Sequence, residues 1–407
     1  MTHDLCAQAV LFCFDGKWHR SSVQAFINHY AGVSEREFYK AELEGSSLIK
    51  LEVADAISYY LEEVVDEILQ GEPLDMREVI VKPRIDGMSG KKRDICDLCI
   101  LHQLLGHLVK LGLDPLFHAR ILPTQFASLP GKGQTGLKRQ IERYLHRKGL
   151  GIVYAQKTDI YHAYGTLQYD VAINLIIGDV PSAKWIIVLL DALSRYAPDG
   201  HLIIGGYLDA WLFNYVMSFA LRYISSRGKI RRKEFLQYVI RTVSYMDDFG
   251  LFGRSKYDLI KSVKILKNYL QEKFKVQLKL KEHIIKFMSY KEERERKHNK
   301  NKGCTCIDMG GYKVHHGYTT IRPRIFIRTR REYLRAWKEA TENGTFRLAR
   351  ANKLIAYYGY IKQTDSALVK QNYHVDYLFK MARKIKSFWA KRFSKEKHER
   401  MLRYALS

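Results

Sequence analysis

Apolar residues recur at two different spacings along the chain and divide it into helical and mixed sections. Residues 1 to about 75 show helical spacing, clearest from Ala54 to Leu69 and ending at Gly71. Residues 151 to about 290 alternate strand and helix patterns, and from about Arg330 onward the pattern is helical again. No internal repeat is evident. The pattern therefore predicts an α+β protein built from several subdomains.

The mixed central section is expected to form a sheet with helices on one face, because short apolar runs alternate there with helical patterns. The predicted elements are a strand that ends at Asp159, helices near Val171, from Lys184 to Tyr196 and from about Asp209 to Tyr223, and two strands around Asp247 that follow the β-branched run Gln237 to Ser244.

The sections on either side of this centre combine turns with short strands and helices. Residues that favour turns interrupt the apolar pattern in both sections. The predicted elements are a strand from Val79 to Pro83, a basic turn from Gly87 to Arg93, a helix from Ile95 to about Leu111, a glycine-rich loop from Pro130 to Gly136, a polar loop from His298 to Gly303, and paired short strands from Tyr312 to Ile327.

Composition places the chain among globular proteins that meet a polyanion. Of its 407 residues 46% are hydrophobic, and no run of about 18 apolar residues predicts a membrane span. His3 and Asp4 stand where a signal peptide needs basic residues, so we expect a cytoplasmic protein. The formal net charge of +25 favours nucleic acid as the partner. Basic residues gather in four runs, at 229–233, 291–302, 322–335 and 380–403.

Four of the cysteines form two closely spaced pairs. Cys96 and Cys99 have the spacing CxxC, and Cys304 and Cys306 have the spacing CxC, so a zinc site joining the two pairs is geometrically conceivable. However, Cys96 and Cys99 also fit one face of the apolar helix predicted from Ile95. Buried free thiols are therefore the favoured interpretation.

Three aspartates are candidates for metal-dependent chemistry. Asp247 and Asp248 are adjacent at a predicted hairpin turn, where both side chains can reach a single site, and the flanking strands are apolar. Asp159 lies near the end of another predicted strand, so the three carboxylates could converge. Magnesium prefers oxygen ligands, and two such ions can support the in-line transfer of a phosphoryl group. We therefore expect two Mg²⁺ ions, with Mn²⁺ as a substitute.

The sequence around these aspartates resembles a known family. Tyr245-Met246-Asp247-Asp248 between apolar strands is similar to the YxDD motif of reverse transcriptases. Lys157-Thr158-Asp159-Ile160-Tyr161-His162-Ala163-Tyr164 resembles the family's first-aspartate motif, which places Tyr164 where an aromatic ring excludes the ribose 2′-hydroxyl. The resemblance implies an RNA-directed DNA polymerase that uses dNTPs, with Asp159, Asp247 and Asp248 as catalytic metal ligands.

Further motifs extend the resemblance over roughly residues 80 to 385, in the order expected of bacterial and phage enzymes. Lys82 to Arg93 and Ser128 to Gln134 resemble fingers motifs, and Ile204 to Trp211 resembles the nucleotide-pocket motif. Lys279 and Lys281 lie where the family keeps a lysine near the triphosphate. The resemblance implies nucleotide contacts by Lys82, Arg84, Arg93, Tyr164, Gly206, Tyr207, Asp209 and Lys279, and a primer grip that contains Gly310, Gly311 and Tyr312.

The implied fold is a right-hand polymerase with a ferredoxin-like palm sheet. Its expected divisions are an N-terminal helical extension at 1–75, fingers at 76–150, a palm with the primer-grip hairpin at 151–325, and a basic helical thumb and tail at 326–407. The implied partners are an RNA template, which we expect to be a non-coding RNA, a DNA primer and product, and dNTPs. A second protein subunit or a homo-oligomer is also open, and no membrane partner is expected.

The nucleotide-pocket motif departs from the family at Asp209, where bacterial relatives often have a serine or an amide residue. One interpretation makes Asp209 the N-cap of the helix that starts at Ala210. The other places its carboxylate in the pocket, where it would accept a hydrogen bond from the exocyclic amine of cytosine or adenine and bias nucleotide choice.

Several functions stay open at the level of sequence. An antiphage defence enzyme working with a non-coding RNA is favoured, because the acidic N-terminal extension and the altered pocket motif look specialised. The alternatives are the enzyme of a diversity-generating retroelement that copies a template repeat, and a template-restricted or nucleotide-selective DNA polymerase. A silent binding protein, an RNA-dependent RNA polymerase and a nuclease each explain fewer of the motifs. Priming from a serine or a tyrosine of the protein is also open.

Overall fold

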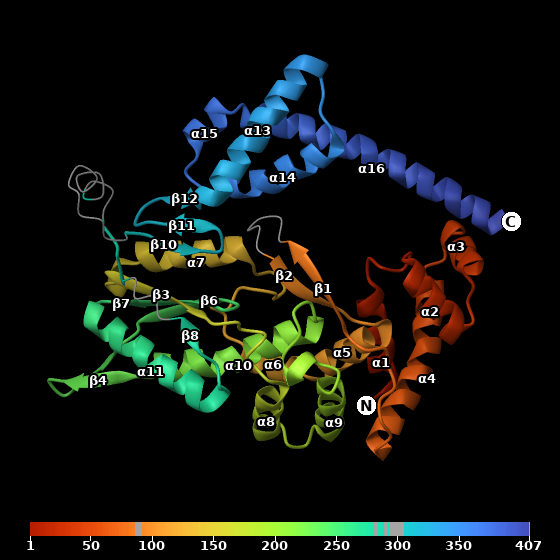
Figure 1. The fold of residues 1–407 in the computed structure, drawn as a ribbon, viewed down its shortest axis with the longest axis horizontal. Coiled ribbons are helices and arrows are strands. Elements are labelled where there is room, and N and C mark those ends of the chain that lie inside the picture. The colour runs from red at the N-terminus through yellow and green to blue at the C-terminus, as the bar shows by residue number, and fades with distance from the viewer. Residues whose placement is uncertain (86–91, 280–283, 289–291, 293–304, 407) are drawn as a thin grey trace.

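A computed structural model of the chain, shown in Figure 1, describes residues 1–85, 92–279, 284–288, 292 and 305–406. It is a mixed structure of helices and small antiparallel sheets. In the part of the chain that is described, no helix is both long enough and apolar enough to cross a bilayer. Three features predicted from the sequence fall outside the described residues, namely most of the basic turn at 87–93, the polar loop at 298–303, and Lys281 with Cys304.

The N-terminal section is helical, as predicted. Its helices are α1 (His3–Phe14), α2 (Ser21–Ala31), α3 (Glu35–Leu43) and α4 (Leu48–Gln70). Helix α4 ends where the sequence predicted, because Gly71 adopts the left-handed conformation with φ of 98°. These helices bury Cys6 and Cys13, and α1 packs against the first helix of the next section, so they share a hydrophobic core with the centre of the molecule.

The next section begins with a two-stranded hairpin rather than a long helix. Cys96 pairs with Val81 across the hairpin and Cys99 is the N-cap of the following helix, so the helix predicted from Ile95 is wrong over its first five residues. Residues 80–85 and 92–97 pair as antiparallel strands, and this pairing overrides the helical spacing. The elements are β1 (Ile80–Ile85), β2 (Lys92–Asp97), α5 (Ile100–Gly112), α6 (Asp114–Arg120), α7 (Gln134–His146) and the 3₁₀ turn η1 (Lys148–Leu150).

A central antiparallel sheet carries the candidate aspartates. Its strands lie in the order β6-β7-β3-β8, and β9 also pairs with β3. The run from Gln237 to Ser244 is divided between two strands, because β5 ends at Gln237 and β6 starts at Arg241. The strands are β3 (Tyr154–Ile160), β6 (Arg241–Tyr245), β7 (Asp248–Gly253), β8 (Leu278–Lys279) and β9 (Ile284–Lys286), and a separate hairpin is formed by β4 (Gly228–Arg231) and β5 (Glu234–Gln237).

Helices pack beside this sheet and supply most of the main core. The long helix after the nucleotide-pocket motif is buried along most of its length, including Trp211, Phe213 and Tyr215. The helices are α8 (Tyr169–Asp179), α9 (Lys184–Ser194), α10 (Tyr207–Ser225) and α11 (Lys256–Phe274), with the 3₁₀ turn η2 (Pro198–Gly200). The predicted strand and helix order is therefore confirmed here.

The C-terminal section starts with a three-stranded meander and continues as helices. The paired short strands are confirmed only as far as Ile321, because a helix begins at Pro323. Proline is favoured in the first turn of a helix, where its missing N–H has no partner to lose. The elements are β10 (Ile307–Met309), β11 (Tyr312–Val314), β12 (Thr319–Ile321), α13 (Pro323–Asn343), α14 (Leu348–Lys362), α15 (Ala367–Asn372) and α16 (Val375–Leu406).

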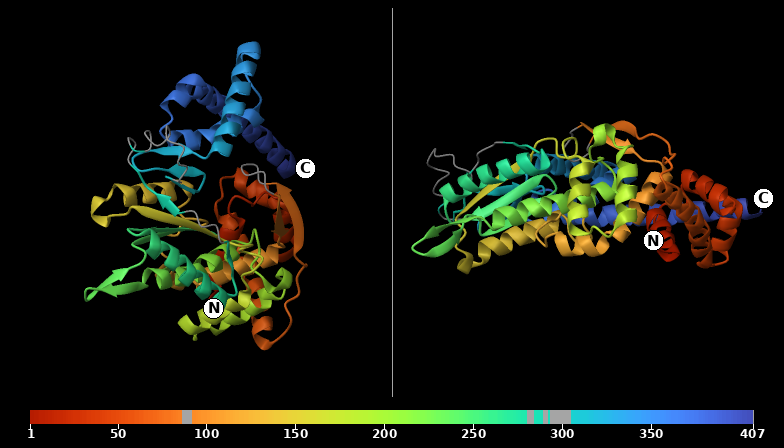
Figure 2. Two further views of the ribbon diagram at one scale, coloured as in Figure 1. Left: turned by 60° about the vertical axis from the view of Figure 1, so that its left-hand side comes forward. Right: turned by 90° about the horizontal axis from the view of Figure 1, so that it is seen from below.

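Three hydrophobic cores hold the molecule together. The largest joins the N-terminal helices to the helices beside the central sheet, the second lies between the sheet, α7 and the meander, and the third lies among α13, α14 and α16. Helix α16 leaves this third core and runs across to α3, as Figures 1 and 2 show. The C-terminal helix is therefore in contact with the N-terminal helical section.

Candidate active site

The three aspartates converge at one end of the central sheet. Asp248 opens β7 and stands directly opposite Asp159 in β3, so the two side chains share a face of the sheet. Asp247 belongs to the tight turn between β6 and β7, in which Met246 has a φ of 50°. The backbone carbonyl of Asp247 accepts a hydrogen bond of 3.0 Å from the N–H of Ile160. The turn is thus tied to the strand that carries Asp159.

Two lysines neutralise part of this negative charge. Lys279 stands opposite Asp159 in the neighbouring strand, and its Nζ lies 2.7 Å from Asp159 Oδ2. Lys157 lies two residues before Asp159, on the same face of β3, and its Nζ lies 2.8 Å from Asp248 Oδ1. Ammonium groups therefore stand beside two of the three carboxylates.

The carboxylates are held close together in a poorly solvated place. The pKa of Asp247 is raised to about 7, first by burial and then by the neighbouring carboxylates of Asp248 and Asp159. Burial also raises the pKa of Asp248, although Lys157 opposes that rise. A cluster with these properties favours a cation, since a cation would relieve both the burial penalty and the mutual repulsion.

The donor set fits a hard divalent cation. All the candidate ligands are carboxylate oxygens, which is what Mg²⁺ and Mn²⁺ prefer. The Oδ1 atom of Asp159 is buried and has no hydrogen-bond partner, so it is free to coordinate an ion. As the side chains now stand, the described residues contain no group of three or more His, Cys, Asp or Glu arranged to hold a metal ion.

A cavity of about 410 Å³ surrounds the carboxylates. Arg93 reaches it from β2, and Gly310 and Gly311 reach it from the turn between β10 and β11, so residues predicted for three different motifs meet here. The remaining lining residues are Gln134, Lys157, Asp159, Tyr245, Asp247, Asp248, Arg322, Arg324, Ile325 and Tyr360. An opening of this size, with acids on one wall and arginines on another, suits a polyphosphate ligand.

Tyr164 lies beside the turn that carries Asp247. Its hydroxyl donates to the sulfur of Met246 over 3.7 Å, and its ring stacks on Phe213 with the centroids 5.2 Å apart. Burial raises the pKa of the Tyr164 hydroxyl above its ordinary value, with smaller contributions from Asp209 and Asp247. The hydroxyl is thus neutral, and the ring is fixed next to the catalytic turn.

Asp209 does not cap the helix in the way that one interpretation of the sequence predicted. The N-cap of α10 is Gly206, and Asp209 lies in the first helical turn with only 1% of its surface exposed. Its Oδ1 accepts hydrogen bonds of 2.7 Å from the hydroxyl of Tyr169 and from the N–H of Ile203. A Cβ atom at Gly206 would lie 1.8 Å from Asp209 Oδ2, so the glycine makes room for this carboxylate.

The nucleotide-pocket motif borders a second, smaller cavity of about 210 Å³, which is lined by Asp209 and Tyr207 but by none of the three catalytic candidates. Tyr207 stacks on His107 with ring centroids 4.1 Å apart. The influence of Asp209 on nucleotide choice stays a prediction. Any such effect would have to act through the position of α10, because the carboxylate does not line the larger cavity.

Two predicted basic contacts lie away from the larger cavity. Lys82 forms an ion pair of 2.6 Å with Asp97 on the neighbouring strand, and Arg84 stands opposite Arg93 in the hairpin. Neither side chain lines the larger cavity. Tyr312 is buried in the second core beside the two glycines that do line it.

Sequence reasoning missed Gln134 and Tyr360 as lining residues. The hydroxyl of Tyr360 donates to Gln134 Oε1 over 2.7 Å, which joins α14 to the start of α7 across the cavity. The two residues are 226 positions apart, so no local spacing could have paired them. Arg322 forms an ion pair of 2.6 Å with Asp308, and its place at the start of the basic run at 322–335 was the available signal.

The cysteines give no support to a metal centre in the described part of the chain. Cys96 and Cys99 are half-buried free thiols near the start of α5, and Cys306 is buried. Burial raises the pKa of the Cys96 thiol, which disfavours the thiolate form that zinc binds. Because Cys304 lies outside the described residues, the pairing of the two cysteine pairs stays untested.

Comparison with known proteins finds distant similarity in structure. No protein-family model matches the chain, and no curated protein matches it. Among solved structures, apo telomerase from Candida tropicalis is 12% identical over 99% of this chain and 84% of that chain, with a TM-score of 0.43. A form of it truncated from the C-terminal domain is 12% identical over 73% of this chain and 71% of that chain, with a TM-score of 0.40. Telomerase from Candida albicans in complex with a TWJ fragment of telomeric RNA is 10% identical over 92% of this chain and 72% of that chain, with a TM-score of 0.42.

Proposed function

We propose that the chain is an RNA-directed DNA polymerase that adds dNTPs to a 3′ end. The observation that carries the proposal is the convergence of Asp159, Asp247 and Asp248 in one cavity with basic residues around it. Carboxylates that are close enough to raise one another's pKa are costly to keep together, so their clustering favours a functional site.

Asp159, Asp247 and Asp248 would hold two Mg²⁺ ions, with Mn²⁺ as a substitute. When bound, the ions would stabilise negative charge on the attacking and leaving oxygens. Lys157 and Lys279 neutralise part of the charge of the carboxylates, and their ammonium groups would become available to phosphate oxygens if cations took their place.

The proposed reaction is an in-line phosphoryl transfer. The 3′-oxygen of the primer forms a bond to the α-phosphorus of the dNTP, the bond from that phosphorus to the bridging oxygen breaks, and pyrophosphate leaves. The proton of the 3′-hydroxyl passes to solvent. Arg93, which lines the cavity, would bind the triphosphate with its fork of N–H donors.

The preference for deoxynucleotides is assigned to Tyr164. Its ring is stacked on Phe213 and rests against Met246 of the catalytic turn, so it cannot swing away to make room for an extra hydroxyl. A fixed ring at this place would exclude a ribose 2′-hydroxyl by steric contact.

The arrangement of the elements supports the same proposal. The strand order β6-β7-β3-β8, with α10 before β6 and α11 after β7, agrees with the order expected of a ferredoxin-like palm. The hairpin β1–β2 would then belong to the fingers, the meander β10–β12 would be the primer grip, and α13 to α16 would form the thumb. The arginines at 322–335 and the basic face of α16 suit the phosphates of an RNA template and a DNA primer.

DNA synthesis by the purified full-length protein tests the proposal. The assay supplies Mg²⁺ and each dNTP on RNA-templated and DNA-templated primers, with and without co-purifying RNA. We expect a DNA product that vanishes in the Asp247→Ala/Asp248→Ala variant. Asp191→Ala is the matched control, since Asp191 is an exposed acid paired with Arg195 on α9. Absence of synthesis on every template, primer and partner RNA would overturn the proposal.

For the biological setting we keep the expectation of antiphage defence with a non-coding RNA. The neighbouring genes distinguish the two biological settings that are compatible with the motifs. A cluster of defence genes supports it, whereas a template repeat beside a variable target gene supports a diversity-generating retroelement instead.

A further inference from the structure

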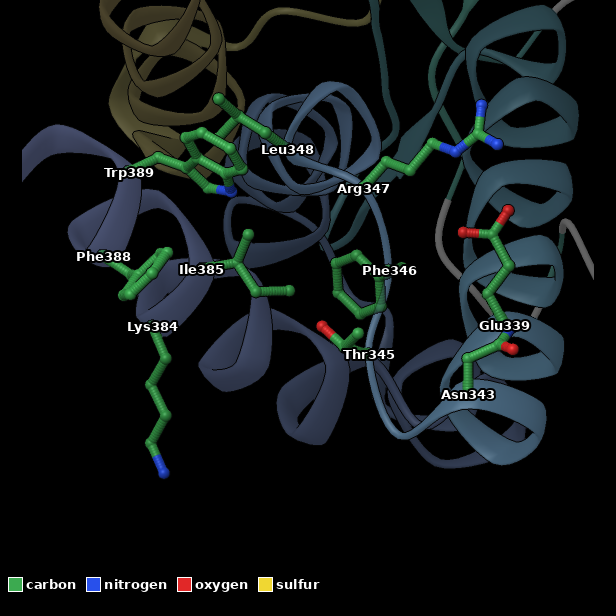
Figure 3. A pocket seen from close by; sticks show the side chains of 10 residues that line it. All are labelled: Glu339, Asn343, Thr345, Phe346, Arg347, Leu348, Lys384, Ile385, Phe388 and Trp389. Atoms are coloured by element: carbon green, nitrogen blue, oxygen red, sulfur yellow. The ribbon is translucent and has the colours of Figure 1, made fainter. Parts of the chain in front are cut away.

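A further cavity lies among the C-terminal helices. It has a volume of about 940 Å³ and opens between the loop that joins α13 to α14 and the middle of α16, as Figure 3 shows. None of its lining residues lines the cavity around the aspartates. Its walls are made by Glu339, Asn343, Thr345, Phe346, Arg347, Leu348, Lys384, Ile385, Phe388 and Trp389.

Aromatic side chains from α16 stand at this cavity without a covering element. Phe388 has 62% of its surface exposed, and Phe393, one turn beyond Trp389, is also exposed. The rings of Trp389 and Phe393 lie 5.5 Å apart at a tilt of 34°. Phe346 forms the buried floor. Flat apolar rings left open in this way are costly in water unless a ligand covers them.

The cavity is also bordered by uncompensated positive charge. Between residues 380 and 395 the helix carries seven lysines and arginines and no aspartate or glutamate. Within the described residues, Lys384 and Arg347 form no ion pair. Arg392 is paired with Glu396 at 2.9 Å, and its guanidinium lies 5.1 Å from the centre of the Trp389 ring. The one carboxylate in the wall, Glu339, is neutralised by Arg350 at 2.7 Å.

We propose that this cavity, with the adjacent face of α16, binds an unpaired strand of nucleic acid. Bases would stack on Trp389, Phe388 and Phe393, and the phosphates between them would lie against Lys384, Arg347 and Arg392. Stacking platforms that alternate with basic residues are the usual means of binding single strands without sequence preference. The site goes beyond the proposed polymerase centre, because it takes a strand that is not paired at the active site.

The chemistry of the cavity favours this occupant over others. In a duplex the bases are already stacked on each other, so they cannot enter the cavity, and a duplex could use only the basic residues. An apolar peptide would cover the rings but would leave the lysines and arginines unmatched. A single strand satisfies both kinds of group.

Equilibrium binding of labelled oligonucleotides to the full-length protein tests the proposal. The ligands are oligo(U), oligo(dT) and a blunt duplex of equal charge, and EDTA prevents any polymerisation. We expect Phe388→Ala/Trp389→Ala to weaken binding of both single strands by about tenfold or more, because each lost stacking contact is substantial. Binding of the duplex should change less than about twofold, since its phosphate contacts remain.

Two further variants make the outcome decisive. Tyr377→Ala removes another exposed aromatic ring of α16 outside the cavity, and it should leave single-strand binding unchanged. Trp389→Phe keeps a stacking ring, so it should retain binding while losing the tryptophan fluorescence quenching that a bound strand causes. Equal losses for duplex and single strands, or no loss in the double variant, would overturn the proposal. Binding of only one of the two single strands would show that the sugar is read as well, which contradicts recognition by stacking alone.

Discussion

At the scale of single residues, Asp209 shows how burial gives a carboxylate a structural role. Burial raises its pKa from 3.8 to about 6, although the hydrogen bonds from Ile203 and Tyr169 oppose the rise. The folded protein therefore binds the proton more tightly than the unfolded chain does. The contribution of this group to stability is fully present below about pH 4 and is lost as the pH rises through about 6.

We predict that Asp209→Asn removes this pH dependence. The unfolding free energy of the native protein should fall relative to that of the variant by up to about 3 kcal/mol between pH 4 and pH 7, from 1.36 kcal/mol per pKa unit. Chemical denaturation at several pH values measures the difference. Parallel stability curves for the two proteins would mean that Asp209 has an ordinary pKa.

A second prediction concerns Tyr164. If its ring excludes the 2′-hydroxyl, Tyr164→Val should raise the incorporation of ribonucleotides relative to deoxynucleotides by about tenfold or more. Tyr164→Phe is the matched control, because it keeps the ring and loses only the contact with Met246. The ratio of kcat/KM values for one rNTP and its dNTP provides the measurement. An unchanged ratio in the valine variant would remove Tyr164 from the nucleotide site.

The candidate aspartates could be chosen from the sequence because strand register brings them together. Asp247 and Asp248 are adjacent at a turn, so only the strand that ends at Asp159 had to be predicted in addition. The bond between Gln134 and Tyr360 could not be predicted, because it depends on how α14 packs over α7. The interpretation of Asp209 as an N-cap was wrong for a related reason, since the helix starts at Tyr207, three residues before Ala210.

At the scale of elements, the turn between β10 and β11 is fixed by close packing against α14. Gly311 has a φ of 86°, and a Cβ atom there would lie 2.8 Å from Cε1 of Tyr360. Gly317, in the next loop, has a φ of 100° but no atom within 4 Å of such a Cβ. A side chain at either glycine would therefore strain the backbone, but only a side chain at Gly311 would also come into steric contact with other atoms.

We predict that Gly311→Ala destabilises the protein by about 1–3 kcal/mol more than Gly317→Ala, because only the first variant forces Tyr360 to move. It should also raise the KM for primer, since the turn lines the cavity around the aspartates. Thermal unfolding and primer titration check the two effects. If both glycine variants behaved alike, Gly311 would not contact α14.

Elements with a strong internal period were predicted well, whereas those decided by their neighbours were not. Helices α4 and α10 have long apolar faces and were found near their predicted bounds. Residues 95–99 have helical spacing, yet Ile95, Cys96 and Asp97 pair with β1 and the helix begins only at Ile100. The predicted strand pattern stops at Pro323, where a helix starts instead. This change from strand to helix depends on the meander before it.

At the scale of the whole molecule, α16 links the C-terminal helices to the N-terminal ones. Its first turns are anchored in the third core by Val375, Leu378 and Ala382, and its far end places Met401 in the main core with 8% of its surface exposed. Between these anchors the helix is basic and exposed. It therefore connects the C-terminal helices to α3 in the N-terminal section (Figure 1).

We predict that Met401→Asp releases the far end of α16 and leaves its beginning in place. Amide hydrogen exchange should quicken in the last turns of the helix, while the residues near Leu378 stay protected. Ser387→Asp, in the exposed middle of the helix, is the control and should not cause this pattern. Unchanged exchange at the end of the helix in Met401→Asp would show that the contact with α3 does not hold it.

The central claim is that Asp159, Asp247 and Asp248 form a two-ion centre, and Mn²⁺ binding in the presence of a non-reactive dNTP analogue tests it most directly. Electron paramagnetic resonance counts the bound ions in the native protein and in an Asp159→Asn/Asp247→Asn/Asp248→Asn variant. The account predicts about two tightly bound ions in the native protein and their loss in the variant. Equal Mn²⁺ binding by the two proteins would contradict it.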